Sequence, residues 1–172
     1  MKKSTKMSGS TQSPGQADEA DRQVTALEEQ TARLQAILDT SVVAIVSIDE
    51  HGIIEMVNRA TTDMFGWEEG SMIGRNVSII VPPPHAEMHD GYIRAYLQTG
   101  IRKVLGHARE VMARRRDGTL IPIEITLSET RFGDHHHFTA VIRDISARKA
   151  ATRELEAAMK RLTRANEYLR AV

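Results

Sequence analysis

The chain has 172 residues, 41% of them hydrophobic, and its 23 Lys and Arg are balanced by 23 Asp and Glu. This length allows one domain with extensions and excludes a large multidomain enzyme, and the zero net charge provides no overall field to attract nucleic acid or anionic lipid. Because cysteine is absent, disulfides, cysteine zinc sites, thiol nucleophiles and thiol–flavin photochemistry are excluded, which leaves His, carboxylate and Met side chains as metal ligands.

The first 40 residues predict a tail followed by a helix. Residues 1–22 are polar and lack an apolar repeat, which predicts a disordered tail because such a segment cannot bury enough surface to offset the entropy of ordering. In residues 23–40, mainly apolar side chains recur at spacings of three and four, as in a short coiled-coil helix; they are Val24, Leu27, Thr31, Leu34 and Leu38. No apolar run is long enough to cross a bilayer or to form a signal peptide, so we expect a cytoplasmic protein without a membrane partner.

The middle of the chain, residues 41–146, carries strand, turn and helix signals in the order β-β-α-α-α-β-β-β. Val42–Ile48 and Ile53–Val57 predict a hairpin, after which Asn58 predicts the N-cap of a short helix that the next glycine ends. Three prolines precede a predicted helix over His85–Gln98, and the expected strands beyond it are Leu105–Ala113, Thr119–Ser128 and Phe138–Arg143. This order predicts an α+β fold with a five-stranded antiparallel sheet and helices on one face.

The C-terminal segment, residues 147–172, repeats the amphipathic pattern of the N-terminal helix. Its stripe consists of Leu155, Ala158, Leu162, Ala165 and Leu169. Neither flanking helix covers its own stripe, and isolated helices of this length are marginal in water, so we expect a homodimer in which the helices pair in parallel across a twofold axis. Asp144, at the end of the last strand, can cap the C-terminal helix.

Most of the histidines have an ordinary explanation. His51 and His85 lie beside turns, where a solvated imidazole is expected. His135, His136 and His137 cannot all converge on one ion because adjacent strand residues point to opposite faces, so we expect a polar hairpin turn there. No nucleophile elbow, Walker A loop or H-E-x-x-H motif is present, so we expect no enzymatic activity in this chain.

His89, His107 and Arg109 are the candidate ligand-binding residues. His89 lies on a helical stripe that faces the sheet if it is the buried one, together with Tyr92, Ile93 and Tyr96. A neutral imidazole there could bind a metal ion. His107 and Arg109 are two residues apart in an expected strand, so they share one face, and an inward Arg109 would require an anion or a polar ligand. A satisfied core histidine and a solvated strand face remain the alternatives on spacing alone.

Motifs across residues 38–146 resemble those of the PAS family. They include Ile48-Asp49, His51-Gly52-Ile53-Ile54, Met64-Phe65-Gly66-Trp67, Ile73-Gly74-Arg75-Asn76, Arg115-Arg116-Asp117-Gly118-Thr119 and Arg143-Asp144-Ile145-Ser146. Within this family the chain is most similar to the haem-binding PAS domains of the FixL family of rhizobial oxygen-sensing histidine kinases. The residues that carry this second resemblance are Pro82-Pro83-Pro84-His85, His89-Asp90-Gly91-Tyr92-Ile93, Tyr96, Gly106 and Arg109-Glu110-Val111.

The resemblance implies haem b as a cofactor. His89 matches the helix histidine that is the proximal iron ligand, and Arg109 matches the strand arginine that hydrogen-bonds oxygen or a haem propionate. The residues that match the distal apolar wall, whose bulk limits which diatomic ligand fits, are Val104, Ile125 and Leu127. Ala95 replaces an arginine associated with the propionates, so Lys103 or Arg94 would have to serve instead.

His107 departs from the pattern of the sensors that this chain most resembles, which have an aliphatic residue at that position. The haem PAS domains of direct oxygen sensor phosphodiesterases have a methionine there that binds iron as a sixth ligand, at a similar separation from the proximal histidine. Coordination of the iron by both His89 and His107 is therefore chemically accessible. In the alternative, His107 points at a propionate and the iron stays five-coordinate. Both arrangements stay open, because Gly106 permits backbone adjustment in either direction.

Two functions remain open. The resemblance implies a haem-binding PAS sensor of oxygen, CO, NO or redox state, which relays a signal through the flanking helices to a histidine kinase or another effector. The alternative is a cofactor-free PAS module for dimerisation in signal transduction, with its pocket filled by side chains.

Overall fold

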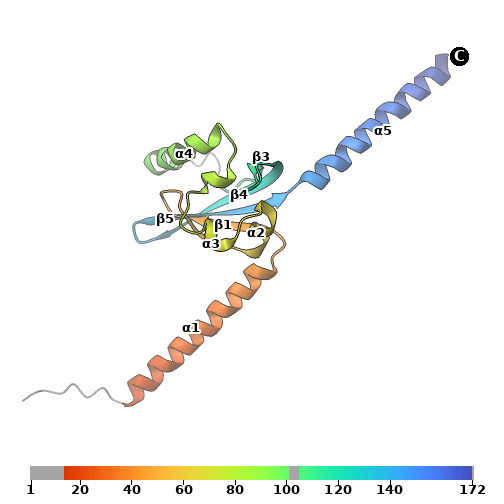
Figure 1. The fold of residues 1–172 in the computed structure, drawn as a ribbon. Coiled ribbons are helices and arrows are strands. Elements are labelled where there is room, and N and C mark those ends of the chain that lie inside the picture. The colour runs from red at the N-terminus through yellow and green to blue at the C-terminus, as the bar shows by residue number, and fades with distance from the viewer. Residues whose placement is uncertain (1–13, 101–104, 172) are drawn as a thin grey trace, which may run out of the picture. The chain divides into compact units, whose positions relative to one another are not determined.

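The computed structural model of the protein describes residues 14–100 and 105–171 (Figure 1). The chain divides between Leu38 and Asp39 into two units, the first of which consists of helix α1 (Pro14–Thr40) up to the division. The predicted disordered tail is wrong for residues 14–22, which lie in this helix. These residues include good helix formers such as Ala, Glu and Gln, and proline is favoured at the first helical position. Residues 1–13, the rest of the predicted tail, lie outside the described residues.

Five strands of the second unit form one antiparallel sheet in the order β2-β1-β5-β4-β3. In chain order they are β1 (Ala44–Ile48), β2 (Ile54–Val57), β3 (Arg109–Arg114), β4 (Leu120–Phe132) and β5 (His135–Asp144). The first hairpin, β1 and β2, joins the three C-terminal strands through the pairing of β1 with β5. This sheet, with helices between its second and third strands, confirms the predicted α+β fold.

Two strands begin two or more residues later than predicted, and β2 and β4 begin one residue later. β1 begins at Ala44 rather than at Val42, whose side chain is 93% exposed. β3 begins at Arg109 rather than at Leu105, because Gly106 adopts a φ of 79° and turns the chain before the strand. β4 and β5 are longer than predicted, since they remain paired up to the turn between Phe132 and His135.

Four short elements lie between β2 and β3: α2 (Arg59–Phe65), α3 (Glu69–Met72), the 3-10 helix η1 (Val77–Ile80) and α4 (His85–Thr99). Asn58 caps α2 as predicted, because its Oδ1 accepts a hydrogen bond from the Thr61 backbone N–H at 3.1 Å. The same buried side chain bonds β1: Oδ1 accepts from the Ile45 N–H at 2.9 Å, and Nδ2 donates to the Val43 carbonyl at 2.9 Å. Asn58 therefore fixes α2 against the first strand.

The core lies between the inner face of the sheet and these helices. Its most deeply buried large side chains are Phe65, Ile54, Met72, Ile142 and Val46. From α4, Ile93 is buried in this core. A side chain from every strand and from each helix between β2 and β3 therefore contributes to one apolar cluster, which sets the distance of the helices from the sheet.

Helix α5 (Ser146–Ala171) follows β5 directly. Asp144 Oδ1 accepts a hydrogen bond from the Ser146 N–H at 2.8 Å, in agreement with the predicted cap, and Asp144 forms an ion pair with Arg115 at 3.3 Å. Burial raises the pKa of Asp144, but the hydrogen bonds from Ser146 and the charge of Arg115 outweigh it and hold this pKa below its ordinary value. In the described part of the chain, no helix has the length and apolar character that crossing a membrane requires.

Candidate cofactor site

Helix α4 positions His89 toward the core. On this helix His89 and Tyr96 are partly buried, and Ile93 between them is buried, so the three share the inward face. Contrary to the prediction, Tyr92 does not share this face. Its side chain is 49% exposed, and its Oη lies 3.2 Å from Nδ1 of His85, which is itself exposed. The helical period explains the difference, because steps of four and seven residues from His89 return to the same face more closely than a step of three.

The His89 imidazole has the protonation state in which histidine binds a metal ion. Its Nδ1 is buried and has no hydrogen-bond partner among the described residues. Burial lowers the pKa of the imidazole, and the neighbouring Asp90 carboxylate opposes this shift only in part. His89 is therefore neutral near pH 7 and retains a nitrogen lone pair. Residues 14–100 and 105–171 contain no group of three or more His, Asp or Glu placed to bind a metal ion together.

The inner face of the sheet is open where β3 pairs with β4. Arg109 lies opposite Ile125, and alternation along β3 places it on the same face as Val111 and buried Ala113. Val111 is 37% exposed, and Ile125 and Leu127 are only partly buried. The Arg109 side chain is exposed rather than enclosed, and it makes no ion pair or hydrogen bond among the described residues. Among the described residues, this end of the inner face therefore combines partly exposed apolar side chains with the cationic side chain of Arg109.

The segment before β3 differs from its prediction. Lys103 and Val104 lie outside the described residues. Leu105 bridges Leu127 in parallel, and the Gly106 N–H donates to the Leu127 carbonyl at 2.9 Å. The expected shared strand face of His107 and Arg109 is wrong, because His107 lies in the exposed bend after Gly106, outside β3.

Arg94, a proposed propionate partner, is exposed on α4, and its Nε donates to the Asp90 carbonyl at 3.4 Å. This bond is made within the helix and leaves the side chain at the surface.

The run of three histidines lies on β5 and not in a turn. Each imidazole Nδ1 contacts a different carboxylate: His135 with Glu50 at 3.2 Å, His136 with Glu129 at 2.5 Å, and His137 with Glu55 at 2.7 Å. The predicted divergence of adjacent side chains agrees with these separate partners. Sequence reasoning did not identify the carboxylates; in the structure, alternation along β5 from buried Phe138 puts His136 on the inner face.

Residues 32–145, about two thirds of the chain, match the family model of the PAS fold. The chain belongs to the PAS family. Among curated proteins, this PAS domain is 36% identical over 131 residues to Sensor protein FixL of Bradyrhizobium diazoefficiens, covering 76% of the chain and 26% of that protein. It is 31% identical over 146 residues to the cell-division control histidine kinase PdhS of Brucella ovis, covering 85% of the chain and 14% of that kinase.

The PAS fold is also found in solved structures similar to this one. The PAS domain of an HTR-like protein from Haloarcula marismortui superposes with a TM-score of 0.59 at 26% identity, covering 73% of this chain and 99% of that one. The chain spans about a quarter of the length of FixL and less of PdhS. It is a PAS sensor domain of signal transduction, related to histidine kinase sensors.

Proposed function

We propose that this PAS domain binds haem b through His89 and senses a diatomic gas, either O2, CO or NO, or the redox state of the iron. The observation that carries the proposal is the neutral imidazole of His89, held toward the core with Nδ1 unpartnered among the described residues. Haem iron takes four ligands from its porphyrin, so one neutral imidazole is a sufficient protein ligand. The match of His89-Asp90-Gly91-Tyr92-Ile93 to the haem-binding PAS motif and the 36% identity to FixL support this assignment.

The remaining residues fit a flat apolar group with anionic edges. Ile93 and Tyr96 of α4 would line the proximal side, with Tyr92 at its edge, and Ile125 and Leu127 would form the distal wall with Val104. Arg109 would donate a hydrogen bond to bound oxygen or to a propionate at the open end of the inner face, and Arg94 or Lys103 would bind the propionates. Ferrous haem supplies reversible binding of a diatomic gas.

A path from this site to α5 passes through β3. Arg109 and Glu110 are adjacent in the strand and point to opposite faces of the sheet. On the outer face, Glu110 forms ion pairs with two residues in the first turn of α5, with Arg148 at 2.8 Å and with Lys149 at 2.6 Å. A displacement of β3 that repositions Arg109 would therefore also move the start of the C-terminal helix, which we propose leads to a histidine kinase or another effector.

The function is tested by the absorption spectrum of the unmodified protein, purified after expression with haem supplied. We expect a Soret band with about one haem per chain, measured as the pyridine haemochrome. A colourless, monodisperse protein that also fails to take up added haemin would contradict the proposal and favour the cofactor-free module.

The same spectrum tests His107 as a sixth ligand. Because His107 is exposed on the bend before β3, we expect a five-coordinate, high-spin ferrous iron. Sharp low-spin bands that the change His107→Ala converts to a high-spin spectrum would instead assign the sixth position to His107.

Arg109→Ala is expected to weaken oxygen binding or to speed autoxidation about ten- to a hundredfold, since it removes one charge-assisted hydrogen bond. Stopped-flow oxygen kinetics measure the effect. The melting temperature should change little, because the Arg109 side chain is exposed and makes no ion pair or hydrogen bond among the described residues. Arg114→Ala removes an arginine from the opposite face of the same strand and serves as the control; equal oxygen kinetics in both variants would remove Arg109 from the sensing role.

A further inference from the structure

Three side chains from separate elements form a hydrogen-bonded network beneath the C-terminal half of α4. The Tyr96 hydroxyl of α4 donates to Oε2 of Glu129 on β4 at 2.6 Å, and Nδ1 of His136 on β5 lies 2.5 Å from Oε1 of the same carboxylate. The Tyr96 ring also contacts Phe138 edge to face, with centroids 5.7 Å apart. The network therefore joins the helix that carries His89 to the two longest strands of the sheet.

Burial makes this network costly to leave incomplete. The Glu129 side chain is only 12% exposed and that of His136 is 22% exposed. A desolvated carboxylate is stable only when it is hydrogen-bonded and charge-compensated, and removing one member of such a group is strongly unfavourable. Tyr96 thus has a fixed position relative to β4 and β5. Because it lies two helical turns after His89 on the same face, it also limits how α4 can rotate or slide.

A second polar contact holds α4 beside His89. Asn76 Nδ2 donates to Oδ1 of Asp90 at 2.8 Å and lies 3.4 Å from the His51 carbonyl in the turn between β1 and β2. A Cβ added to Gly52 in that turn would lie 3.1 Å from Asp90 Oδ1, and Gly52 has a φ of 80°, so both the space and the backbone favour glycine there. His89 therefore lies between two polar anchors, one at its neighbour Asp90 and one at Tyr96.

We propose that Glu129 is a positioning residue, which acts through Tyr96 to fix α4 and hence the imidazole of His89 against the inner face of the sheet. The inference rests on the proposed haem function for its purpose, since a metal ligand must be held in one orientation. The arrangement of Tyr96, Glu129 and His136 does not depend on that function.

The first test uses the protein without haem and measures the pKa of His89 by NMR titration. Glu129→Gln and Tyr96→Phe should each raise this pKa toward about 6.5, because a loosened α4 admits water to an imidazole whose burial now lowers it. Loss of the negative charge at Glu129 would by itself lower the pKa, so the sign of the shift separates the two effects. Tyr96→Phe changes no charge and provides a second route if Glu129→Gln does not fold.

Glu55→Gln is the matched control. It removes the same kind of contact, between a carboxylate and the His137 imidazole at 2.7 Å, but on the other face of β5. We expect this variant to leave the pKa of His89 unchanged. An unchanged pKa in both Glu129→Gln and Tyr96→Phe, or an equal shift in Glu55→Gln, would overturn the proposal.

The second test uses the haem-loaded protein. Glu129→Gln and Tyr96→Phe should shift the iron–histidine stretching band in the ferrous resonance Raman spectrum and speed haem transfer to apomyoglobin about tenfold. Faster haem loss without a shift of this band would indicate a merely structural role and overturn the proposal. If the unmodified protein binds no haem, the proposed function fails, but the titration of His89 still decides whether Glu129 positions it.

Discussion

His89→Ala is expected to abolish the Soret band of the purified protein. The substitution removes the only iron ligand that α4 offers at this position, and the loss should lower haem affinity by more than about 100-fold, because changes to residues that merely orient a metal ligand already reduce affinity 10- to 100-fold. Titration with haemin, followed by absorption, measures the effect. Added imidazole should restore part of the band by occupying the space left by the side chain.

His85→Ala is the control for this change. It removes an exposed histidine from the first turn of the same helix, where its Nδ1 lies 3.2 Å from the Tyr92 hydroxyl. We expect haem binding close to that of the unmodified protein. Retention of a normal Soret band in His89→Ala would assign the iron to another residue.

The lowered pKa of His89 also predicts a pH dependence. In the unfolded chain the imidazole titrates at about 6.5, whereas burial lowers its pKa in the folded protein. Between the two values the unfolded chain binds more protons, so the stability that this neutral histidine contributes is present above about pH 6.5 and is lost as the pH falls toward the folded value. Urea unfolding of the haem-free protein should show a weaker pH dependence in His89→Ala than in His85→Ala.

The fold could be predicted from the sequence because its signals are local. Asn58 caps α2, and Gly100 ends α4 with a φ of 64°. Asn is favoured at the N-cap of a helix and Gly just after its C-terminus, so both ends could be predicted from the residue type. The start of β3 could not be predicted, because the apolar residues near Leu105 extend the strand pattern across the turn at Gly106. Strand assignment there depends on pairing with β4, which local pattern does not specify.

The candidate site was predictable in part for the same reason. Helical spacing placed His89 and Ile93 on one face, but it also included Tyr92, which is exposed because a step of three residues from His89 departs further from that face than steps of four and seven. The partner of Tyr96 was not predictable, because Glu129 is 33 residues away and comes close only through the packing of α4 on the sheet. Side chains that one element supplies can be read from its period, whereas contacts between distant elements require the tertiary structure.

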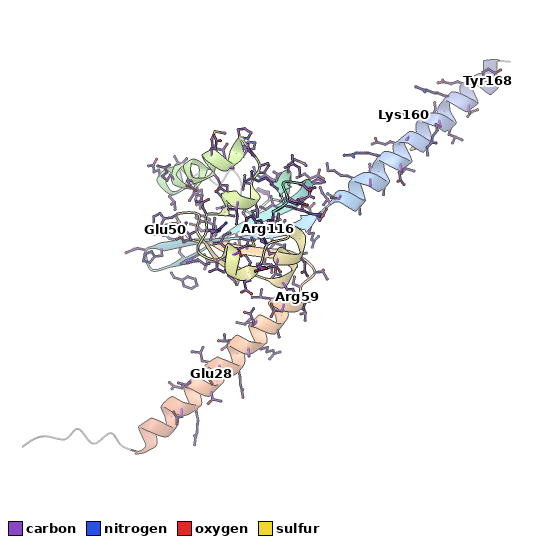
Figure 2. All side chains as sticks on the ribbon, in the orientation of Figure 1. Glu28, Glu50, Arg59, Arg116, Lys160 and Tyr168 are labelled. Atoms are coloured by element: carbon purple, nitrogen blue, oxygen red, sulfur yellow. The ribbon has the colours of Figure 1, made fainter. Side chains whose placement is uncertain are left out.

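The second large effect concerns the oligomeric state, which we expect the flanking helices to determine. Apolar side chains along both helices are largely exposed, among them Leu27 at 64%, Leu34 at 57%, Leu155 at 62% and Leu162 at 72%. Figure 2 shows side chains projecting from both helices along their length. Isolated helices of this kind are marginal in water, and a stripe of this size is stable when a second copy covers it. We therefore expect the unmodified protein to be a homodimer through these helices.

Leu34→Lys combined with Leu162→Lys should convert this dimer to a monomer, measured by light scattering at micromolar concentration. Each change replaces about 2 kcal/mol of apolar burial with a charge in both copies, so dimer affinity should fall by roughly a thousandfold or more. Ala26→Lys with Ala157→Lys adds the same charges on the other side of each helix and should leave the dimer intact. A monomer before any substitution would refute the pairing, and dissociation in both double variants would attribute the effect to charge rather than to the stripe.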